Sequence, residues 1–460
     1  MKKLLVILVS LVLALSLGAC GGSASQAAKS KDVVTVLTYP LYDGNSKAGQ
    51  PSYKDRLQSL IKEFEKSHPN IQIKVQYVSW DQGPEKFSVA LNAGTPPDIF
   101  FTTSTPEATF IKSGLAVPLN KYLTKNDLND IEPAAIRNWT LSNKIWGVQM
   151  WNALYTLGGN VDLLKSKGVD IQKIQKDGWT WDQFYKIAAK FKDAKTSSGQ
   201  QVYGFLTMGD NTAGDETYAE LMRNNGVIGM VSPSGKFKWQ GTKAVETLNF
   251  MQKLLDNGIM PKYTAQISQE KMTDMFNDGE AAIFGRIGPY QIPQNDLRNK
   301  EISQGKVSGP KLDLALLPFP HYKGEKQVTI GGGGGYALFR QKKYQGEQHT
   351  KDAAAVLKWL TGTKASSAAA DQFIIPARYS GQKMYAKQLQ FNTDNGKFEL
   401  NYLNKVVLSP KLSSALAAKA TQADTNAVQP KYQSFLAGEL KATDAVTQWT
   451  QAAESILNGK

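Results

Sequence analysis

The stretch GTPPDIFFTTSTPE, residues 94–107, carries the pattern from which the fold can be predicted. Two prolines and Asp98 lead into the apolar run Ile99–Phe101, and four hydroxyl residues, Thr102–Thr105, follow at once. A short apolar run bounded by turn residues is typical of a buried strand. The hydroxyl cluster indicates a polar site at the end of that strand, although Thr105-Pro106-Glu107 would also start a helix well.

The segments before this stretch alternate between strand and helix patterns. Strands are predicted at residues 33–37 and 71–77, and helices over residues 57–64 and 87–91. Units of roughly thirty residues in strand–helix order predict an α/β domain with a mainly parallel sheet. Ligands of such sheets bind beyond the carboxyl ends of the strands, where Tyr39–Asp43 and Thr102–Thr105 fall.

Later segments predict a second set of α/β elements. Thr180 and Gln183 form a capping box before a helix, and further strands are predicted at residues 202–206, 281–284, 314–318 and 336–339. Five consecutive glycines, Gly331–Gly335, enter the last of these strands. They lack the lysine of a phosphate-binding loop, so they favour a hinge or a close approach of the backbone to a ligand.

The N-terminus has the features of an export signal. Lys2 and Lys3 precede an apolar run over Leu4–Leu17, which is shorter than a membrane span normally needs. Leu17-Gly18-Ala19-Cys20 resembles a bacterial lipobox, and Cys20 is the only cysteine. We therefore expect a lipoprotein signal peptide over residues 1–19, lipidation of Cys20 by acyl chains such as palmitate, and a flexible tether over residues 20–31. A plain signal peptide with an incidental cysteine is the alternative.

Composition narrows the function classes. The chain has 460 residues, which predicts two or three domains, and a formal net charge of +14. Its lysines are scattered, so attraction to an anionic cell envelope is favoured over nucleic-acid binding. His68, His321 and His349 are far apart and fit no metal spacing, and the chain has no nucleophile elbow. We expect no catalytic residues, no metal and no cofactor.

An ordered series of motifs resembles the extracellular sugar-binding proteins of bacterial ABC importers, solute-binding family 1, to which maltose-binding proteins belong. The series runs from about residue 32 to 455. Each motif alone is weak evidence for the family, and the ordered series is strong evidence. Its members are Ser59–Tyr77, Trp80-Asp81, Ala93–Ile99, Gly114–Leu119, Trp146–Val148, Asn160–Leu164, Thr180–Asp182, Gly279–Ile283, Gly288-Pro289-Tyr290, Gly332–Leu338 and Ile375–Arg378.

This resemblance implies a two-lobe periplasmic-binding-protein fold of type II, with a three-segment hinge. We expect crossings near Gln149–Asn152, Ile330–Gly333 and Ile375–Arg378. The first lobe would comprise residues 32–150 and 333–375, and the second residues 151–332 and 376–460. The lobes would close over a carbohydrate and present it to membrane permease subunits, with an ATPase driving import. The protein would be a monomer on the outer face of the cell membrane.

The resemblance and the strand ends together supply candidate ligand-binding residues. Aromatic rings stack on sugar C–H faces, and amide, hydroxyl and charged groups bond sugar hydroxyls. The candidates are Tyr39, Tyr42, Asp43, Trp80, Thr102, Thr103, Ser104, Thr105, Trp151, Asn152, Asp210, Arg286, Tyr290, Tyr336 and Arg378.

The exact cargo stays open at this stage. The family's usual Gly-Pro-Trp is Gly288-Pro289-Tyr290 here, and Thr102 and Thr105 stand where bulkier residues are usual, which indicates a wider pocket or a longer ligand than a disaccharide. An acidic sugar could pair with Arg286 and Arg378. Polyamine, ferric iron or peptide cargo on the same fold, and an exported glycoside hydrolase, are the alternatives.

Overall fold

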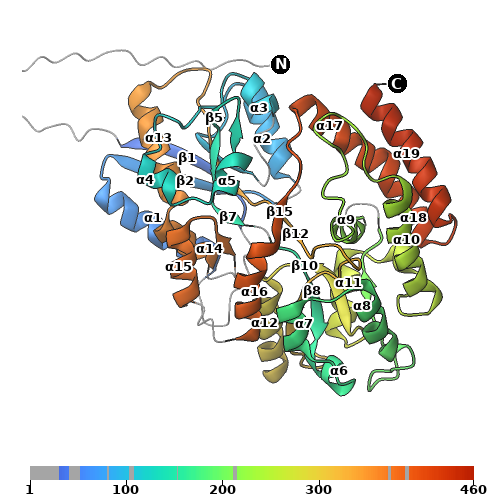
Figure 1. The fold of residues 1–460 in the computed structure, drawn as a ribbon. Coiled ribbons are helices and arrows are strands. Elements are labelled where there is room, and N and C mark those ends of the chain that lie inside the picture. Colours follow the sequence, from blue (N-terminus) through green and yellow to red (C-terminus); the bar gives the residue numbers. More distant parts are fainter. Residues whose placement is uncertain are drawn as a thin grey trace, which may run out of the picture.

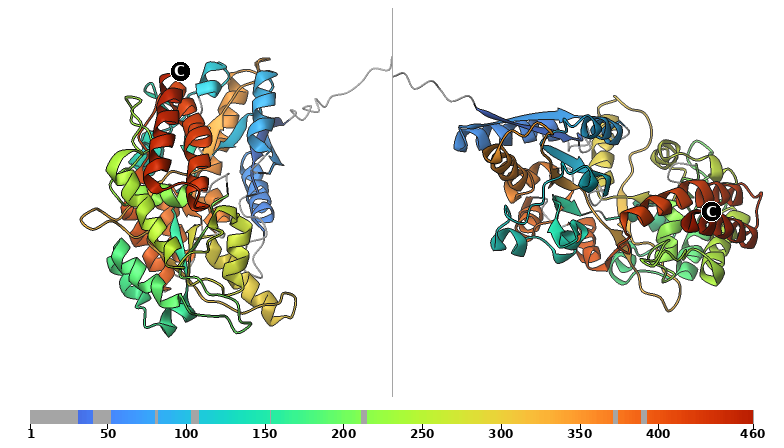
Figure 2. Two further views of the ribbon diagram at one scale, coloured as in Figure 1. Left: turned by 90° about the vertical axis from the view of Figure 1, so that its right-hand side faces the viewer. Right: turned by 90° about the horizontal axis from the view of Figure 1, so that it is seen from above.

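The chain folds into two α/β bodies that lie side by side and are joined by several crossings of the chain (Figures 1 and 2). The computed structural model describes residues 31–40, 52–79, 82–102, 108–152, 154–210, 215–370, 374–388 and 393–459. We call the body built on the larger sheet the first lobe and the other body the second lobe.

A five-stranded sheet forms the centre of the first lobe, in the order β2-β1-β3-β13-β6. Its strands are β1 (Asp32–Thr38), β2 (Ile71–Tyr77), β3 (Ile99–Thr102), β6 (Gly147–Gln149) and β13 (Gly335–Leu338). β1 is parallel to both β2 and β3, as the strand–helix pattern predicts. β13 runs antiparallel to β3 and β6, so this sheet is mixed rather than wholly parallel.

Helices pack around this sheet, and the longer ones bury an apolar stripe against it. In α1, for example, Leu57, Leu60, Ile61 and Phe64 are buried, and Ser52 caps the first turn. The helices of this lobe are α1 (Tyr53–Ser67), α2 (Gly83–Asn92), α3 (Ala108–Lys112), α4 (Lys125–Asn129), α5 (Pro133–Asn138), α13 (Glu347–Leu360) and α14 (Thr363–Ala370), with a small hairpin of β4 (Thr140–Leu141) and β5 (Lys144–Ile145).

The second lobe is built on a four-stranded sheet, in the order β11-β8-β10-β9. Its strands are β8 (Thr156–Asn160), β9 (Leu206–Thr207), β10 (Ile283–Ile287) and β11 (Leu314–Leu317). Its helices are α6 (Val161–Ser166), α7 (Ile171–Asp177), α8 (Trp181–Ala188), α9 (Glu216–Arg223), α10 (Gly241–Asp256), α11 (Gln269–Asn277), α12 (Gln291–Ser303), α16 (Asp394–Tyr402), α17 (Ser414–Ala423), α18 (Gln429–Leu436) and α19 (Ala442–Asn458). The predicted capping box of Thr180 and Gln183 is present at the start of α8.

Within the part of the chain that the structure describes, three segments connect the lobes. The first runs from β6 through β7 (Trp151–Asn152) to β8, and the second from β12 (Thr329–Gly331) to β13. The third contains β14 (Ile375–Pro376), which pairs with β7, and β15 (Val406–Leu408), which pairs with β12. Helix α15 (Tyr379–Gln388) packs on α14, and α16 packs on β11. The exact lobe boundaries given above stay a prediction.

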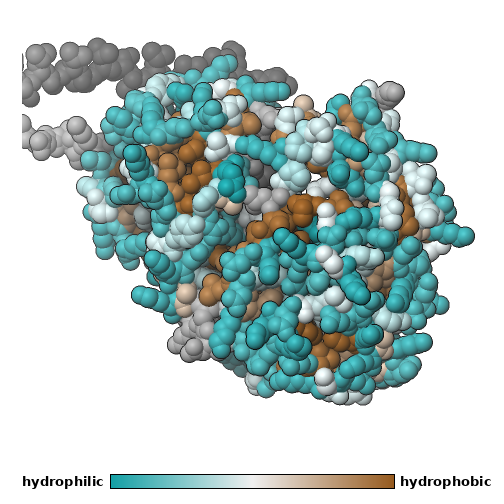
Figure 3. Space-filling model, viewed as in Figure 1, coloured by the Kyte–Doolittle hydropathy of each residue, from teal (hydrophilic) through white to brown (hydrophobic). Residues whose placement is uncertain are grey.

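Apolar side chains form separate cores in the two lobes, around Phe87 and Phe100 in the first and around Trp179, Phe184 and Trp449 in the second. Polar side chains cover most of the face seen in Figure 3, with apolar patches between the lobes and on each lobe. Within the described residues, no helix combines the length and apolar character needed to cross a membrane.

Candidate functional site

A cavity of about 270 Å³ lies where the first two crossings meet the second lobe. Trp151 and Tyr155 come from the first crossing, and Ile330–Gly334 from the second. Helix α9 contributes Glu216, Ala219 and Arg223, and β10 contributes Arg286. The two crossings are tied together beside the cavity, because Thr329 Oγ1 donates to the Tyr155 carbonyl at 2.9 Å. Ligand pockets typically lie between domains in this way.

Arg286 is held flat in the cavity wall by two neighbours. Its guanidinium carbon lies 3.2 Å from the centre of the Tyr155 ring, a cation–π contact. The same guanidinium is ion-paired with Glu216 at the start of α9. Burial by itself would lower the pKa of Arg286, but Tyr155, Glu216 and Glu220 raise it above its ordinary value. Arg286 is therefore a fixed cation whose charge is matched by a carboxylate.

A second arginine and carboxylate pair lies along α9. Arg223 donates to Glu220 Oε1 at 3.1 Å, and the backbone N–H of Ile330 also donates to the Glu220 carboxylate. Glu220 is fully buried, which raises its pKa, whereas Arg223 reaches the cavity wall. The cavity wall therefore presents Arg286, Arg223 and Glu216, which offer both donors and acceptors, while Glu220 pairs with Arg223 from behind the wall.

The glycine run makes room for Trp151. A Cβ atom on Gly333 would lie 1.7 Å from the Trp151 carbonyl oxygen, and one on Gly334 would lie 2.0 Å from Trp151 Nε1. The indole lies nearly parallel to the Phe101 ring, with 6.5 Å between centroids and 23° between planes. The glycines were predicted to serve a hinge or a close backbone approach. They lie at the second crossing, and the close approach is to Trp151.

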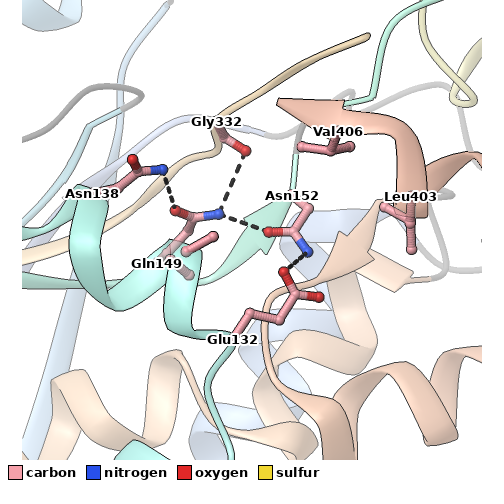
Figure 4. Close-up of a pocket in the computed structure, with 9 residues that line it drawn as sticks. Glu132, Asn138, Gln149, Asn152, Gly332, Leu403 and Val406 are labelled. Carbon is pink, nitrogen blue, oxygen red and sulfur yellow. Dashed lines mark hydrogen bonds between the residues drawn. The ribbon is translucent and has the colours of Figure 1, made fainter. Parts of the chain in front are cut away.

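Asn152 points into a different and smaller cavity, of about 40 Å³, which shares only Gly332 with the first (Figure 4). Asn152 Nδ2 donates to Glu132 at 3.1 Å, and Asn152 Oδ1 accepts from Gln149 Nε2 at 2.7 Å. A space of this size holds one or two waters rather than a sugar. These hydrogen bonds therefore link the first crossing to the start of α5, and Asn152 does not line the larger cavity.

Three predicted site residues are core residues in the structure. Tyr39 packs edge-on against Phe101 in the first-lobe core, where burial raises its pKa to about 12. Tyr336 is fully buried on β13 and its hydroxyl group bonds with Thr38 Oγ1 at 3.1 Å. Arg378 is also buried, donates to the Thr361 carbonyl and pairs with Asp130. The predictions that these three side chains face the cleft are wrong, because their strand and loop positions direct them inward.

Other predicted residues lie near the cavity without forming its wall. Tyr290 is half-buried beside Tyr155 and Arg286, and burial raises its pKa. Thr102 ends β3 opposite Gly335 and is buried in the sheet. Asp210 is half-buried, and its backbone N–H donates to Ile267. Tyr42, Asp43, Trp80, Thr103, Ser104, Thr105 and Cys20 lie outside the described residues.

The cavity brings the predicted residues Trp151 and Arg286 together with Tyr155, Glu216 and Arg223, which sequence reasoning did not name. Tyr155 comes four residues after Trp151 on the same crossing, and this closeness in sequence could have indicated that it lies at the same cavity. Glu216 and Arg223 belong to a helix whose position depends on the fold of the whole second lobe, so no local pattern marked them. Within the described residues, no group of histidine, cysteine and acidic side chains could hold a metal ion.

Two α/β lobes joined by several crossings, with a polar and aromatic cavity at those crossings, define a two-lobe ligand-binding protein. Residues 50–367 match the family of bacterial extracellular solute-binding proteins, and the chain belongs to that family. This is a family of binding proteins rather than enzymes.

Individual proteins similar to the chain agree with this assignment. A putative binding protein of Brucella abortus is 22% identical over 298 residues, which cover 63% of this chain and 66% of that protein. The galactooligosaccharide-binding protein of Bacillus subtilis is 24% identical over 321 residues, 68% of each chain. The crystal structure of the cyclic alpha-maltosyl-1,6-maltose binding protein from Arthrobacter globiformis superposes with a TM-score of 0.71 at 16% identity, covering 94% of this chain and all of that one. At that identity the superposition establishes the two-lobe fold alone.

Proposed function

We propose that the protein binds a carbohydrate, an oligosaccharide rather than a single sugar, in the cavity between its lobes and delivers it to an ABC importer. The observation that supports this most is the pairing of Arg286 with both the Tyr155 ring and Glu216 in the cavity wall. Aromatic surface beside paired donors and acceptors suits a ligand with apolar C–H faces ringed by hydroxyls. The relative from Bacillus subtilis is named for galactooligosaccharide binding.

The same geometry favours a neutral sugar over an acidic one. An acidic sugar would use Arg286 and Arg378, but Arg378 is buried in the first lobe and pairs with Asp130. Arg286 and Arg223 are each matched by a carboxylate. A uronate in this cavity would meet Glu216 as well as Arg286, and like charges at close range repel.

Delivery follows from hinge closure, which brings the two lobes together over the ligand and forms a surface for the permease. We further propose that the chain is exported, is lipidated at Cys20 and acts as a monomer on the outer face of the membrane. The lipobox-like Leu17–Cys20 supports the anchor.

A ligand panel tests the proposal. The protein from Gly21 onward is melted with maltotriose, β-1,4-galactotriose, cellotriose, galacturonate oligomers, spermidine and ferric citrate. A ligand at a hundred times its dissociation constant stabilises the folded chain by about 2.7 kcal/mol, which a melt resolves. We expect a shift with a neutral oligosaccharide that is recovered unchanged from the mixture.

Each alternative function predicts a different result in that ligand panel. A shift with spermidine or ferric citrate alone would replace the carbohydrate by another solute on the same fold. Shortened sugar products in the recovered mixture would establish a hydrolase.

A further inference from the structure

Among the residues that the structure describes, the indole N–H of Trp151 has no hydrogen-bond partner, although the nitrogen is buried. Buried polar groups in folded proteins are nearly always bonded, so an exception calls for an explanation. The Gly334 carbonyl already accepts from the backbone N–H groups of Met150 at 2.8 Å and Trp151 at 3.2 Å. Among the described residues, the indole N–H therefore meets no acceptor.

The position of Trp151 connects this unused donor to the ligand cavity. Trp151 and Gly331–Gly334 line the same wall, and glycine backbone without side chains is what lies against the nitrogen. One face of the indole is covered by the Phe101 ring. The ring is thus poorly placed to be a broad stacking platform, whereas its N–H edge lies at a crossing that moves when the lobes close.

We propose that the Trp151 indole N–H is a specificity-determining donor, which bonds an oxygen of the bound sugar when the lobes close. This inference rests on the proposed carbohydrate function. The Gly334 backbone lies beside the nitrogen, where a Cβ atom would come within 2.0 Å of it, and the near-parallel Phe101 ring restricts the orientation of the indole. A sugar that offers a hydroxyl or ring oxygen at this point satisfies the donor, and one without an oxygen there leaves it unbonded.

The test replaces Trp151 by phenylalanine, which keeps an aromatic ring against Phe101 and removes the N–H group. Trp239 provides a matched control, because its Nε1 is also buried without a partner among the described residues but lies in the second-lobe core beside Tyr218. Trp151→Phe and Trp239→Phe lose the same ring volume and the same donor. Melting temperatures of both free variants establish that each is folded.

Affinities for maltotriose, β-1,4-galactotriose and cellotriose are measured by titration calorimetry for the wild type and both variants. We expect Trp151→Phe to weaken the sugar that the wild type binds by about tenfold, the equivalent of one neutral hydrogen bond, and Trp239→Phe to leave its affinity unchanged. In a spectrum of ¹⁵N-tryptophan-labelled protein, the Trp151 indole proton should move downfield on saturation with that sugar.

Three results would overturn the inference. Equal affinity of wild type and Trp151→Phe would exclude the donor role and leave the proposed function standing. Equal weakening by Trp151→Phe and Trp239→Phe would assign the effect to lost packing. Failure of the wild type to bind any of the three sugars would remove the proposed function and this inference with it.

Discussion

At the residue scale, the most strongly perturbed histidine lies in the first lobe and not at the cavity. His349 Nδ1 lies 2.7 Å from Asp32 Oδ1, and His349 Nε2 lies 2.9 Å from Asp98 Oδ1. The hydrogen bond with Asp98 is the main reason that the pKa of His349 is raised from 6.5 to about 9. Asp98 also accepts from the backbone and side chain of Thr35, so this imidazolium links α13 to β1 and β3.

This link predicts a pH-dependent stability. Because the folded pKa exceeds the unfolded one, the contribution of His349 is fully present below pH 6.5 and is lost as the pH rises through about 9. We expect His349→Gln to destabilise the protein by roughly 3 kcal/mol at pH 6 and by much less at pH 9.5. Urea unfolding at both pH values measures the difference. His321→Gln is the control, and a penalty independent of pH would contradict the assignment.

Single residues also show how far the sequence predicts the site. Trp151 and Arg286 were found because they follow predicted crossings and strands. Tyr39 and Tyr336 were misplaced because a strand end predicts proximity to the cleft but not the side to which a phenol points. Asp98 was predicted only to lead into a strand. Its pairing with His349, 251 residues away, depends on tertiary structure and was not predicted.

At the element scale, the glycine run can be tested residue by residue. A Cβ at Gly334 would meet Trp151 Nε1 at 2.0 Å and Phe101 at 2.1 Å, whereas one at Gly332 would meet no atom within 4 Å. Overpacking of a filled site typically costs about 1–3 kcal/mol. We expect Gly334→Ala to lose stability in this range and Gly332→Ala to change it little, as measured by denaturant unfolding. Equal effects would show that the run serves flexibility alone.

The edge strand β11 offers a second element-scale test. Asn395 accepts from Leu316 N at 2.9 Å and donates to the Leu314 carbonyl at 2.8 Å, while Gln175 donates to the Leu316 carbonyl at 2.9 Å. These amides occupy the outer edge of β11, which would otherwise be open to pairing with another chain.

Asn395→Ala should expose that edge. We expect a loss of about 1–3 kcal/mol in the free energy of unfolding, because buried backbone groups lose their partners. Aggregation on mild heating should also become faster, as light scattering would measure. The control is Gln172→Ala, which removes an exposed bond to Asp394 nearby. Identical behaviour of the two variants would contradict the role given to Asn395.

Most elements were predictable, and the exceptions have a packing reason. The strands β1, β3, β11 and β13 are largely apolar runs and β2 alternates apolar with polar residues, and all five were predicted within a few residues. The strand β8 was missed because Gly158 and Gly159 are poor strand formers. Both are required, since Cβ atoms there would lie 2.2 Å from Phe284 and 2.7 Å from Leu164.

At the scale of the whole molecule, the order of motifs predicted a two-lobe α/β fold, and the family match and the superposition confirm it. The residues that line the cavity could not all be predicted in the same way. It combines two crossings with α9 and β10, which are brought together only when both lobes are folded.

The proposed lipid anchor at Cys20 determines where the whole molecule is located in the cell. We expect Cys20→Ser to move the protein from the membrane fraction to the medium without changing its melting temperature, because it removes the site for acyl chains. Immunoblots of both fractions measure this. Unchanged membrane association would contradict lipidation at Cys20.

The central claim is that the cavity at the crossings binds a neutral oligosaccharide. The most direct test is calorimetric titration of maltotriose, β-1,4-galactotriose and cellotriose into the wild type and Arg286→Lys, with Arg137→Lys as the control. Lysine keeps the charge of Arg286 but loses its planar contact with Tyr155, so at least one sugar should bind the wild type and bind Arg286→Lys about tenfold or more weakly. Binding of equal strength to all three proteins would place the ligand elsewhere, and no binding of any of these sugars to the wild type would contradict the account.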